Sequence, residues 1–484
     1  MKAKILFLWL ICLITASCNY SKNDVTVYPF PEGETLNVKY KVSANGVDVP
    51  VYNVKIGSEK REDRATGMDD KLNSYKYFDI AGMAYFDMKK GPVKITVTVG
   101  EEITKAKVLP SSFGITPQIN GNSLTFEIDR PRHLTIDING DYVRSLHIIV
   151  NPEETDIPNP DDPNVIYFGP GIHEVACLEV TDNKTVYIAG GAIVKGITHP
   201  PYDPNDFAAR RAARRPTFLL SGNNIVFRGR GIVDQEPVPR EQSHQIMLVR
   251  GNDIKVEGVT LCNSSSWTLS LNGANNVNID NVKIFGHRAN SDGIDICACH
   301  DVLVENCFLR TLDDLIVVKT LRGTGEAGRI IARKCVLWNE VANALSIGAE
   351  LTSNVEDVLF TDCDIIHDHC REWSLRIYQT DSGLIKNVRF ENIRIEESIN
   401  FISLWINTAM WTTDTNRGHI EDVVFKDITV NNSGRPLAKE FEFLGYDADH
   451  AINNVLIENV VINGKKVVKE DIKMNDFVYN VIVK

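Results

Sequence analysis

A nine-residue pattern recurs eight times through the second half of the chain. An Asn or Asp (an Arg in one copy) opens each copy, and apolar residues alternate around a second polar turn, as in "NVNIDNVKI" from Asn276 and "DVLVENCFL" from Asp301. The copies start 23, 25, 28, 28, 30, 35 and 32 residues apart. Period-two alternation predicts strands, and Asn and Asp are typical of the turns between them. Short strands at this interval, with no helical pattern between them, favour an all-β, right-handed parallel β-helix.

A second series of alternating strands lies between these copies. One set of positions is aliphatic in every strand and is predicted to face inward: Leu269/Leu271, Ile294/Ile296, Ile316/Val318, Leu345/Ile347, Leu375/Ile377 and Leu404/Ile406. The other set is predicted to face outward: Ser270/Asn272, Asp295/Cys297, Val317/Lys319, Ser346/Gly348, Arg376/Tyr378 and Trp405/Asn407. Because adjacent coils lie about 4.8 Å apart, the outward set predicts one polar and aromatic face on the surface.

The chain divides into segments with different patterns. Residues 26–150 alternate between turns rich in Gly, Pro and Asn, which predicts a small antiparallel β-sandwich domain before the solenoid. Residues 151–164 form a linker rich in Pro and Asp, and residues 165–484 form the predicted β-helix.

The N-terminus has the features of an export signal. Lysines precede a short apolar run, and small residues lead to Cys18, so residues 1–18 resemble a lipoprotein signal with Cys18 as the lipidated residue. Thr15 stands where leucine is usual, and a plain cleaved signal peptide is the alternative. The expected location is the outer membrane or cell surface, or otherwise the periplasm or the medium. Membrane contact is expected only through the lipid.

Composition excludes some classes of function. The net charge of −12 and the pI near 5.5 argue against a nucleic-acid partner. No zinc, P-loop or dinucleotide fingerprint is found, so no cofactor and no metal ligands are predicted. His287 and His367 are expected to be surface residues. "ARRAARRP" from Ala209 is either a solvated helix face or a contact for an anionic glycan at the rim of the cleft.

The chain has ten cysteines, and the repeat positions of three of them argue against a disulfide framework at those positions. Cys307, Cys335 and Cys363 occupy equivalent repeat positions, each 28 residues from the next. Equivalent positions stack in a solenoid, and a small apolar thiol suits a stacked core. We therefore predict free, buried thiols at these three positions.

Three acids lie close together at the N-terminal ends of two strands of the second series. "NSDGID" contains Asn290 and Asp292, and "TLDD" places Asp313 and Asp314 at 21 and 22 residues after Asp292. With this spacing, residues 160–465 resemble the polygalacturonases, glycoside hydrolase family 28. That family pairs an Asn-Thr-Asp-Gly element with an Asp-Asp element and later has Gly-His-Gly and Arg-Ile-Lys.

The chain also departs from the family pattern. Asn343 stands in the histidine place and Tyr378 in the lysine place, whereas Arg376 is kept. These changes weaken the expectation of galacturonan as the substrate. A β-sandwich ahead of the helix also resembles family 49, which contains dextranases and isopullulanase, so hydrolysis of a neutral glycan is the alternative.

The resemblance implies an inverting hydrolysis of a polysaccharide or oligosaccharide. Asp313 is expected to be the general acid, and Asp292 and Asp314 are expected to share activation of the water. Inverting enzymes hold the acid and the base carboxyl groups about 6.5–9.5 Å apart, so that a water fits between them. Crowding of like charges is expected to raise at least one pKa. Expected substrate-binding residues are Asn290, Asp295, Asn343, Arg376 and Tyr378, of which Asp295 and Asn343 also fit a structural role.

Two other classes stay open. A polysaccharide lyase on the same fold would need calcium or a strong base, with an Arg or Lys to abstract a proton. A glycan-binding β-helix without catalysis is the third reading, which Asn343 and Tyr378 favour and the three aspartates oppose.

Overall fold

The computed structural model describes residues 21–58, 78–198, 215–239, 244–369, 371–433 and 435–484. Cys18 and residues 209–214 of the arginine-rich segment lie outside these ranges, so the lipid-anchor and rim-contact hypotheses stay predictions. Within the described ranges, no helix is both long and apolar enough to cross a membrane. Helical structure there is limited to short 3-10 turns, Lys22–Asp24 (η1), Ser111–Phe113 (η4) and Lys469–Asp471 (η6).

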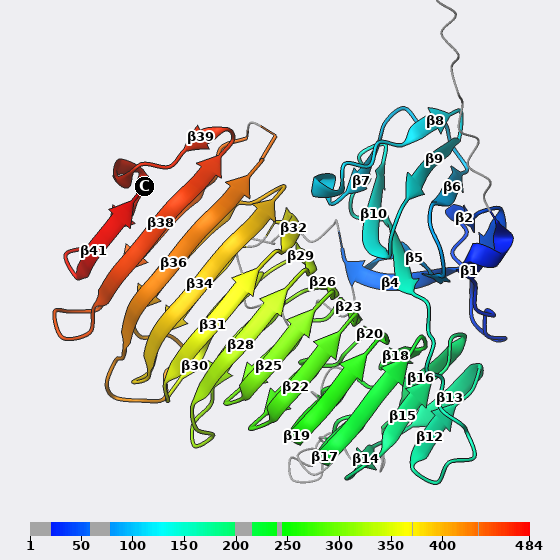
Figure 1. Cartoon of the computed structure of the whole chain (residues 1–484). Coiled ribbons are helices and arrows are strands. Elements are labelled where there is room, and N and C mark those ends of the chain that lie inside the picture. The colour runs from blue at the N-terminus through cyan, green and yellow to red at the C-terminus, as the bar shows by residue number, and fades with distance from the viewer. Residues whose placement is uncertain (1–20, 59–77, 199–214, 240–243, 370, 434) are drawn as a thin grey trace, which may run out of the picture.

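Two sheets formed by residues 25–152 lie beside the solenoid (Figure 1). The first contains β1 (Val25–Thr26), β4 (Val51–Gly57), β5 (Phe78–Met88), β7 (Ala106–Leu109), β10 (Arg132–Ile138) and β11 (Leu146–Pro152). The second contains β2 (Tyr40–Ala44), β3 (Val47–Val49), β6 (Val93–Val99), β8 (Gln118–Asn120) and β9 (Ser123–Ile128). Buried residues of both sheets share one core, which confirms the β-sandwich.

One pairing in the sandwich differs from the antiparallel prediction. Strands β5 and β11 run parallel, while the other described pairs are antiparallel. The chain leaves β5 for β6 in the second sheet and moves between the two sheets before β11, so these neighbours are not joined by a hairpin. Alternation alone does not distinguish the two pairings.

From β12 onward the strands stack in three parallel columns, which make a β-helix (Figure 1). The first column holds β12 (Val165–Phe168), β15 (Thr185–Ile188), β17 (Phe218–Gly229), β19 (Met247–Glu257), β22 (Asn275–Asp280), β25 (His300–Glu305), β28 (Ala327–Arg333), β31 (Val355–Thr361), β34 (Leu384–Ile395), β36 (His419–Val430), β38 (Ile452–Ile462) and β41 (Val478–Val483). The second holds β13 (Gly171–Val175), β16 (Ala192–Gly196), β18 (Ile232–Asp234), β20 (Thr260–Cys262), β23 (Lys283–Phe285), β26 (Phe308–Thr311), β29 (Val336–Asn339), β32 (Asp364–Asp368) and the ends of β34, β36 and β38.

The third column holds β14 (Leu178–Val180), the starts of β17 and β19, β21 (Leu269–Asn272), β24 (Ile294–Cys297), β27 (Ile316–Thr320), β30 (Leu345–Leu351), β33 (Leu375–Gln379), β35 (Asn400–Ile406), β37 (Lys439–Leu444) and β40 (Lys473–Met474). A short strand β39 (Lys465–Lys466) pairs antiparallel with β38.

Left-handed turns explain the Asn and Asp positions of the nine-residue pattern. Asn276 and Asn281, the first and sixth residues of one copy, have φ angles of 51° and 55°. Asn and Asp tolerate this region better than other residues with a Cβ. The turn side chains also stack from coil to coil, as where Asn276 Nδ2 donates to Asp253 Oδ1 at 2.5 Å. The pattern therefore records the backbone conformation of each turn.

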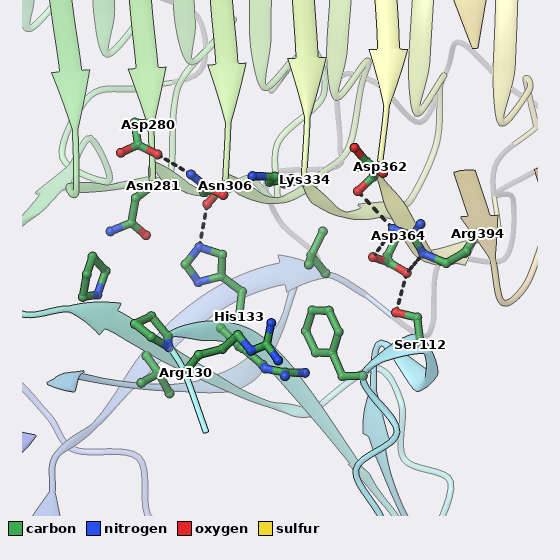
Figure 2. A pocket seen from close by; sticks show the side chains of 16 residues that line it. Ser112, Arg130, His133, Asp280, Asn281, Asn306, Lys334, Asp362, Asp364 and Arg394 are labelled. Carbon is green, nitrogen blue, oxygen red and sulfur yellow. Dashed lines mark hydrogen bonds and ion pairs between the residues drawn. The ribbon is translucent and has the colours of Figure 1, made fainter. Parts of the chain in front are cut away.

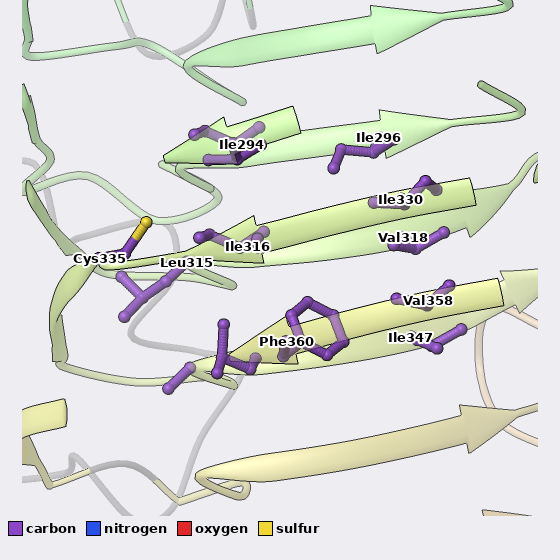
Figure 3. Packing of buried hydrophobic residues seen from close by; sticks show 14 of the residues in the cluster. Ile294, Ile296, Leu315, Ile316, Val318, Ile330, Cys335, Ile347, Val358 and Phe360 are labelled. Carbon is purple, nitrogen blue, oxygen red and sulfur yellow. The ribbon is translucent and has the colours of Figure 1, made fainter. Parts of the chain in front are cut away.

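The inward-facing prediction for the third column is confirmed by its register. Leu269, Ile294, Ile316, Leu345 and Leu375 pair in succession and are all buried. Figure 3 shows Ile294, Ile316 and Ile347 of this column stacked with first-column residues such as Val358 and Phe360. Between β33 and β35, Leu375 pairs with Ile402 instead of the expected Leu404. The shift is two residues, so each side chain stays on its predicted face.

The predicted free thiols are also found. Cys307, Cys335 and Cys363 are buried in the core of the solenoid and form no disulfide. Cys297 and Cys299 are free as well, and Cys370 lies outside the described residues.

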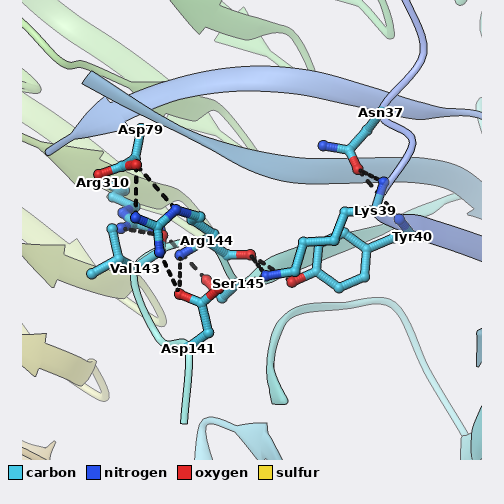
Figure 4. A network of polar contacts seen from close by, with 9 residues as sticks. All are labelled: Asn37, Lys39, Tyr40, Asp79, Asp141, Val143, Arg144, Ser145 and Arg310. Atoms are coloured by element: carbon cyan, nitrogen blue, oxygen red, sulfur yellow. Dashed lines mark hydrogen bonds and ion pairs between the residues drawn. The ribbon is translucent and has the colours of Figure 1, made fainter. Parts of the chain in front are cut away.

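Buried charges join the sandwich to the solenoid. Arg310 of β26 contacts Glu340 through Nε at 3.0 Å and donates to the carbonyl of Val143 at 2.9 Å. Arg230 pairs with Asp87 at 3.0 Å, and both side chains are buried. Figure 4 shows Arg310 beside the polar network around Arg144, Asp141 and Asp79 of the sandwich. These contacts fix the N-terminal sheets against the second column.

Candidate active site

The three aspartates come together at the N-terminal ends of two adjacent third-column strands. Asp292 precedes β24, and Asp313 and Asp314 precede β27. Ile294 pairs with Ile316, and the Gly293 N–H donates to the Asp314 carbonyl at 2.8 Å. One carboxylate oxygen from each aspartate lies within 4.8 Å of the others. The predicted grouping is therefore found.

Two small residues allow this approach. A Cβ on Gly293 would lie 2.4 Å from the carbonyl oxygen of Leu315, so a larger residue would push the two coils apart. The buried Ser291 Oγ accepts from the Leu312 N–H at 3.3 Å, which joins the two acid-bearing loops. Asn290, expected to bind substrate, occupies a left-handed turn with φ 58° just before them.

The aspartates are more enclosed than the predicted surface face. Asp292 is 2% exposed, Asp314 8% and Asp295 0%, whereas Asp313 is half-buried. These side chains face away from the solenoid core as predicted, but they are buried among one another and among neighbours such as Lys319 and Asn343. His287, also expected at the surface, is buried, and its Nδ1–H donates to Asn263 Oδ1 at 3.1 Å.

A buried lysine compensates the negative charge. Lys319 Nζ lies 3.6 Å from Asp292, 3.3 Å from Asp295 and 3.7 Å from Glu350. It also sits over the Trp267 ring, 4.2 Å from the centroid. Burial by itself would lower the pKa of Lys319, but Glu350, Asp295 and Asp292 together raise it well above its ordinary value. Lys319 therefore stays a cation.

Burial raises the pKa of three of the neighbouring aspartates. Burial, followed by the charges of Asp313 and Asp295, raises the pKa of Asp292 well above its ordinary value. Burial raises the pKa of Asp295 to about 7, against the effect of Lys319. Burial and then Asp313 raise the pKa of Asp314 to about 6. The pKa values are raised as expected, but burial contributes more than the expected crowding of like charges, and the cluster as a whole holds a proton near neutral pH.

Asn343 positions Asp314. Its backbone N–H and its Nδ2 both donate to Asp314 Oδ1, at 3.0 and 2.7 Å. Its own Oδ1 accepts from the Trp373 N–H at 3.2 Å. Both partners leave Asn343 oriented toward the aspartates, so this residue contacts the acid cluster in the structure.

Arg376 and Tyr378 lie on the coil beyond Asn343, in register with Ser346 and Gly348 of β30. Arg376 pairs with Glu372 at 2.5 Å and stacks over the Tyr378 ring at 3.8 Å from the centroid. Tyr378 in turn contacts Trp405, at 4.8 Å between ring centroids, and Trp411, at 6.2 Å. Trp411 is 38% exposed, so an aromatic surface opens to solvent here.

The prediction missed several groups that the structure places on this face. Lys319 and Trp405 had outward positions in the strand alignment, but nothing in the alternation showed which partners they would meet. The buried hydroxyls of Ser270, Ser346 and Ser403 occupy this face as well, and they have no hydrogen-bond partner in the described part of the chain. Such groups are normally satisfied by protein, water or a ligand.

A cavity lies between the sandwich and the solenoid, away from the aspartates. A space of about 810 Å³ separates the sandwich from the turns after the first column, near His133, Asn306 and Lys334 (Figure 2). Its acids are bound by neighbours, as Asp364 is by Arg394 and Ser112. It contains no group of three close acids like that of Asp292, so we assign the chemistry to the aspartate cluster.

Comparison with known proteins identifies the family of the chain. The model of glycosyl hydrolases family 28 matches residues 231–478, just over half of the chain, and this span contains all three aspartates. The chain belongs to this family. Within glycosyl hydrolases family 28, a "Probable polygalacturonase" of Vitis vinifera is 24% identical over 236 residues, 44% of this chain and 46% of that protein.

A second relative is similar over a shorter stretch. A "Polygalacturonase" of Juniperus ashei is 30% identical over 184 residues, 36% of this chain and 35% of that protein. The family 28 chain thus spans less than half the length of these curated relatives.

Among solved structures, Dex49A from Penicillium minioluteum superimposes with a TM-score of 0.63 at 13% identity. The match covers 95% of this chain and 96% of that one, so both the sandwich and the solenoid have counterparts there. This agreement confirms the resemblance to family 49 at the level of the fold.

Proposed function

We propose that the protein hydrolyses O-glycosidic bonds of a polysaccharide, with Asp292, Asp313 and Asp314 as catalytic residues. The main support is that one carboxylate oxygen of each aspartate lies within 4.8 Å of the others, in a chain that belongs to a glycosyl hydrolase family. Glycoside hydrolysis needs a proton for the leaving oxygen and a nucleophile at the anomeric carbon. A cluster of acids that holds one proton can supply that proton to the leaving oxygen and can activate a water as the nucleophile.

In the proposed reaction, Asp313 protonates the leaving oxygen, while Asp292 and Asp314 hold the attacking water. A water that donates to two carboxylates at about 2.7 Å each joins oxygens roughly 4.5 Å apart. One oxygen of each aspartate lies within 4.8 Å of the others, so Asp292 and Asp314 are close enough to share a water. Asn343 keeps Asp314 oriented toward that water.

Inversion of the anomeric centre is part of this proposal because the water, rather than a carboxylate, attacks the sugar. Proton NMR of the first product formed from an anomerically defined oligosaccharide tests it. Appearance of the opposite anomer first is expected. The same anomer first would mean that one aspartate forms a covalent intermediate, as retaining enzymes do.

For the substrate, a pectin-type polysaccharide is the first candidate, because the curated relatives are polygalacturonases by name. A neutral glycan is the second, and a specific observation favours it. Lys319 and Arg376 are both paired with acidic side chains, and Asn343 and Tyr378 are uncharged. A uronate carboxylate would compete with Glu372 for Arg376, whereas a neutral sugar needs no free cation.

Sugar rings are expected to extend along the third column toward its C-terminal end. Tyr378, Trp405 and Trp411 offer apolar ring faces that suit the C–H face of a pyranose. Asn290 and Asp295 lie on either side of Asp292 in the sequence, and they complete the proposed binding residues.

Lys319 argues against the lyase alternative. A lyase base must be deprotonated to remove the proton beside a uronate carboxyl, and the acids around Lys319 keep it protonated. Absence of a rise in unsaturated-product absorbance on polygalacturonate would agree with hydrolysis.

The direct test is product release from polygalacturonate, rhamnogalacturonan, dextran, pullulan, carrageenan and agar fragments. The parent is compared with Asp313→Asn and with Asp427→Asn, a matched exposed turn residue at a place where other coils carry Asn. We expect cleavage of one substrate by the parent and the control, and loss of at least about 100-fold in Asp313→Asn. Equal activity of Asp313→Asn contradicts the proposal, and glycan binding without turnover by the parent favours the binding-protein reading.

A further inference from the structure

Two histidines and a glutamate come together on the sandwich side of the solenoid, away from the aspartates. His367 lies in β32, His369 follows that strand, and Glu397 follows β34 on the next coil. One ring nitrogen of each histidine and one carboxylate oxygen of Glu397 lie within 4.8 Å of one another. Glu397 Oε2 is 2.7 Å from His367 Nδ1 and 2.9 Å from His369 Nε2.

These ligand types suit a transition-metal ion. Two imidazole nitrogens and one carboxylate oxygen, with a water as the fourth ligand, are a common zinc set. Tetrahedral ligands at about 2.0–2.1 Å from zinc lie roughly 3.4 Å from one another. Glu397 Oε2 would need to lie about 0.5–0.7 Å farther from the two ring nitrogens to admit the ion.

The site is held in place by its surroundings. The His367 ring contacts Trp338, at 4.1 Å between centroids, and Tyr142 of the sandwich, at 5.2 Å. The second oxygen of Glu397 accepts from Arg435 at 2.7 Å, which fixes the carboxylate as outer partners of metal ligands do. Little rearrangement would be required of any of the three ligands.

The buried histidine has an unmet polar group. His367, expected at the surface, has a side chain only 6% exposed. Neither of its ring nitrogens makes an aligned hydrogen bond with the described residues, although Nδ1 is close to Glu397. Buried polar atoms without a partner call for a ligand, an ion or a water. The side chains of His369 and Glu397 are 22% and 17% exposed, which leaves a path for an ion to enter.

We propose that His367, His369 and Glu397 bind one divalent transition-metal ion, with zinc as the expected ion, where the solenoid meets the sandwich. The ion would crosslink neighbouring coils at a point close in sequence to Trp373. Trp373 donates its backbone N–H to Asn343, so the ion would also brace the residue that orients Asp314. Binding itself is independent of the proposed hydrolysis.

Zinc and cobalt titrations of the untagged, chelator-treated full chain test this site. The parent is compared with His369→Gln and Glu397→Gln by calorimetry with Zn²⁺ and by the visible spectrum with Co²⁺. His450→Gln is the control, because His450 forms a similar histidine–carboxylate pair with Asp447 at 2.7 Å that belongs to no three-ligand group among the described residues.

One zinc per chain in the parent and the control, with binding at least about 100-fold weaker in both ligand variants, is expected. Circular dichroism of each variant checks that it is folded, and Glu397→Gln preserves shape if His369→Gln does not fold. No zinc binding by the parent, or equal binding by the ligand variants, overturns the proposal. In that outcome the three residues form a hydrogen-bonded cluster only.

Discussion

Asp314 is bound more tightly than a solvated turn aspartate would be. Two hydrogen bonds from Asn343 favour its charged form, while burial and Asp313 favour its neutral form and prevail. The result is a carboxyl group whose pKa is raised to about 6. Folding therefore makes this group a better base at neutral pH and imposes a cost in stability.

Replacing Asp314 with Asn should separate these two effects. The amide oxygen still accepts from Asn343, but kcat should fall by roughly 10²–10⁴ because the water loses a base. A carboxyl pKa that rises from ~3.9 to about 6 on folding costs stability progressively as the pH increases between those values, and fully above them. The variant should thus gain up to about 3 kcal/mol at pH 8 and little at pH 4. Urea unfolding at both pH values measures this, and a variant less stable at pH 8 would refute it.

Asn343 is expected to act through Asp314 as a positioning residue. Asn343→Ala removes the side-chain hydrogen bond that favours the charged Asp314, so the pKa of Asp314 should rise further and the acid limb of the pH–rate profile should move to higher pH. We expect about 10–100-fold lower kcat from the loss of orientation. Asn343→Gln should recover part of the activity. An unchanged pH profile would mean that Asn343 serves folding alone.

At the scale of the strand and its turns, one coil shows what happens when residues other than Asn and Asp occupy the turn positions of the nine-residue pattern. Lys334 has φ 55° at the position where the neighbouring coils carry Asn306 and Asp362. Lysine has no local hydrogen bond that compensates this conformation. The cost is small enough for one coil to tolerate it within a ladder of paired strands.

Lys334→Asn should therefore stabilise the solenoid. The expected gain is up to about 1 kcal/mol, seen as a higher urea midpoint with an unchanged slope. Arg329→Asn is the comparison, because Arg329 shares the left-handed turn but also pairs with Asp301 at 2.7 Å. Its gain should be smaller, and a Lys334→Asn variant no more stable than the parent would contradict the assignment of strain to this turn.

At the scale of the whole molecule, the sandwich and the solenoid share an apolar core in which buried charges are set. Arg310 is fully buried between Glu340, Val143 and the Trp338 ring, whose centroid lies 3.7 Å from the guanidinium. His147 of the sandwich contacts the same guanidinium at 3.1 Å. Loss of this side chain would affect both parts of the protein.

Arg310→Met should destabilise the protein by about 3–5 kcal/mol, because it leaves Glu340 buried without its cation. Calorimetry should then resolve an early transition of the sandwich that is absent in the parent. The double variant Arg310→Met with Glu340→Gln should recover part of the loss, since no buried charge remains. A double variant as unstable as the single one would show that packing, and not charge, dominates.

The sequence by itself determined the solenoid, its inward faces and the grouping of the three aspartates, because residues one coil apart stack whatever surrounds them. Alternation predicted which side of β24 and β27 faces inward, and the left-handed turns explain why Asn and Asp recur. Only the tertiary structure decided that Lys319 neutralises the acids, that Asn343 holds Asp314, and that His367, His369 and Glu397 meet. Those contacts depend on loops that do not repeat and on the docking of the sandwich. A periodic pattern carries information about neighbouring coils, whereas the side chains that close over them come from segments without a period.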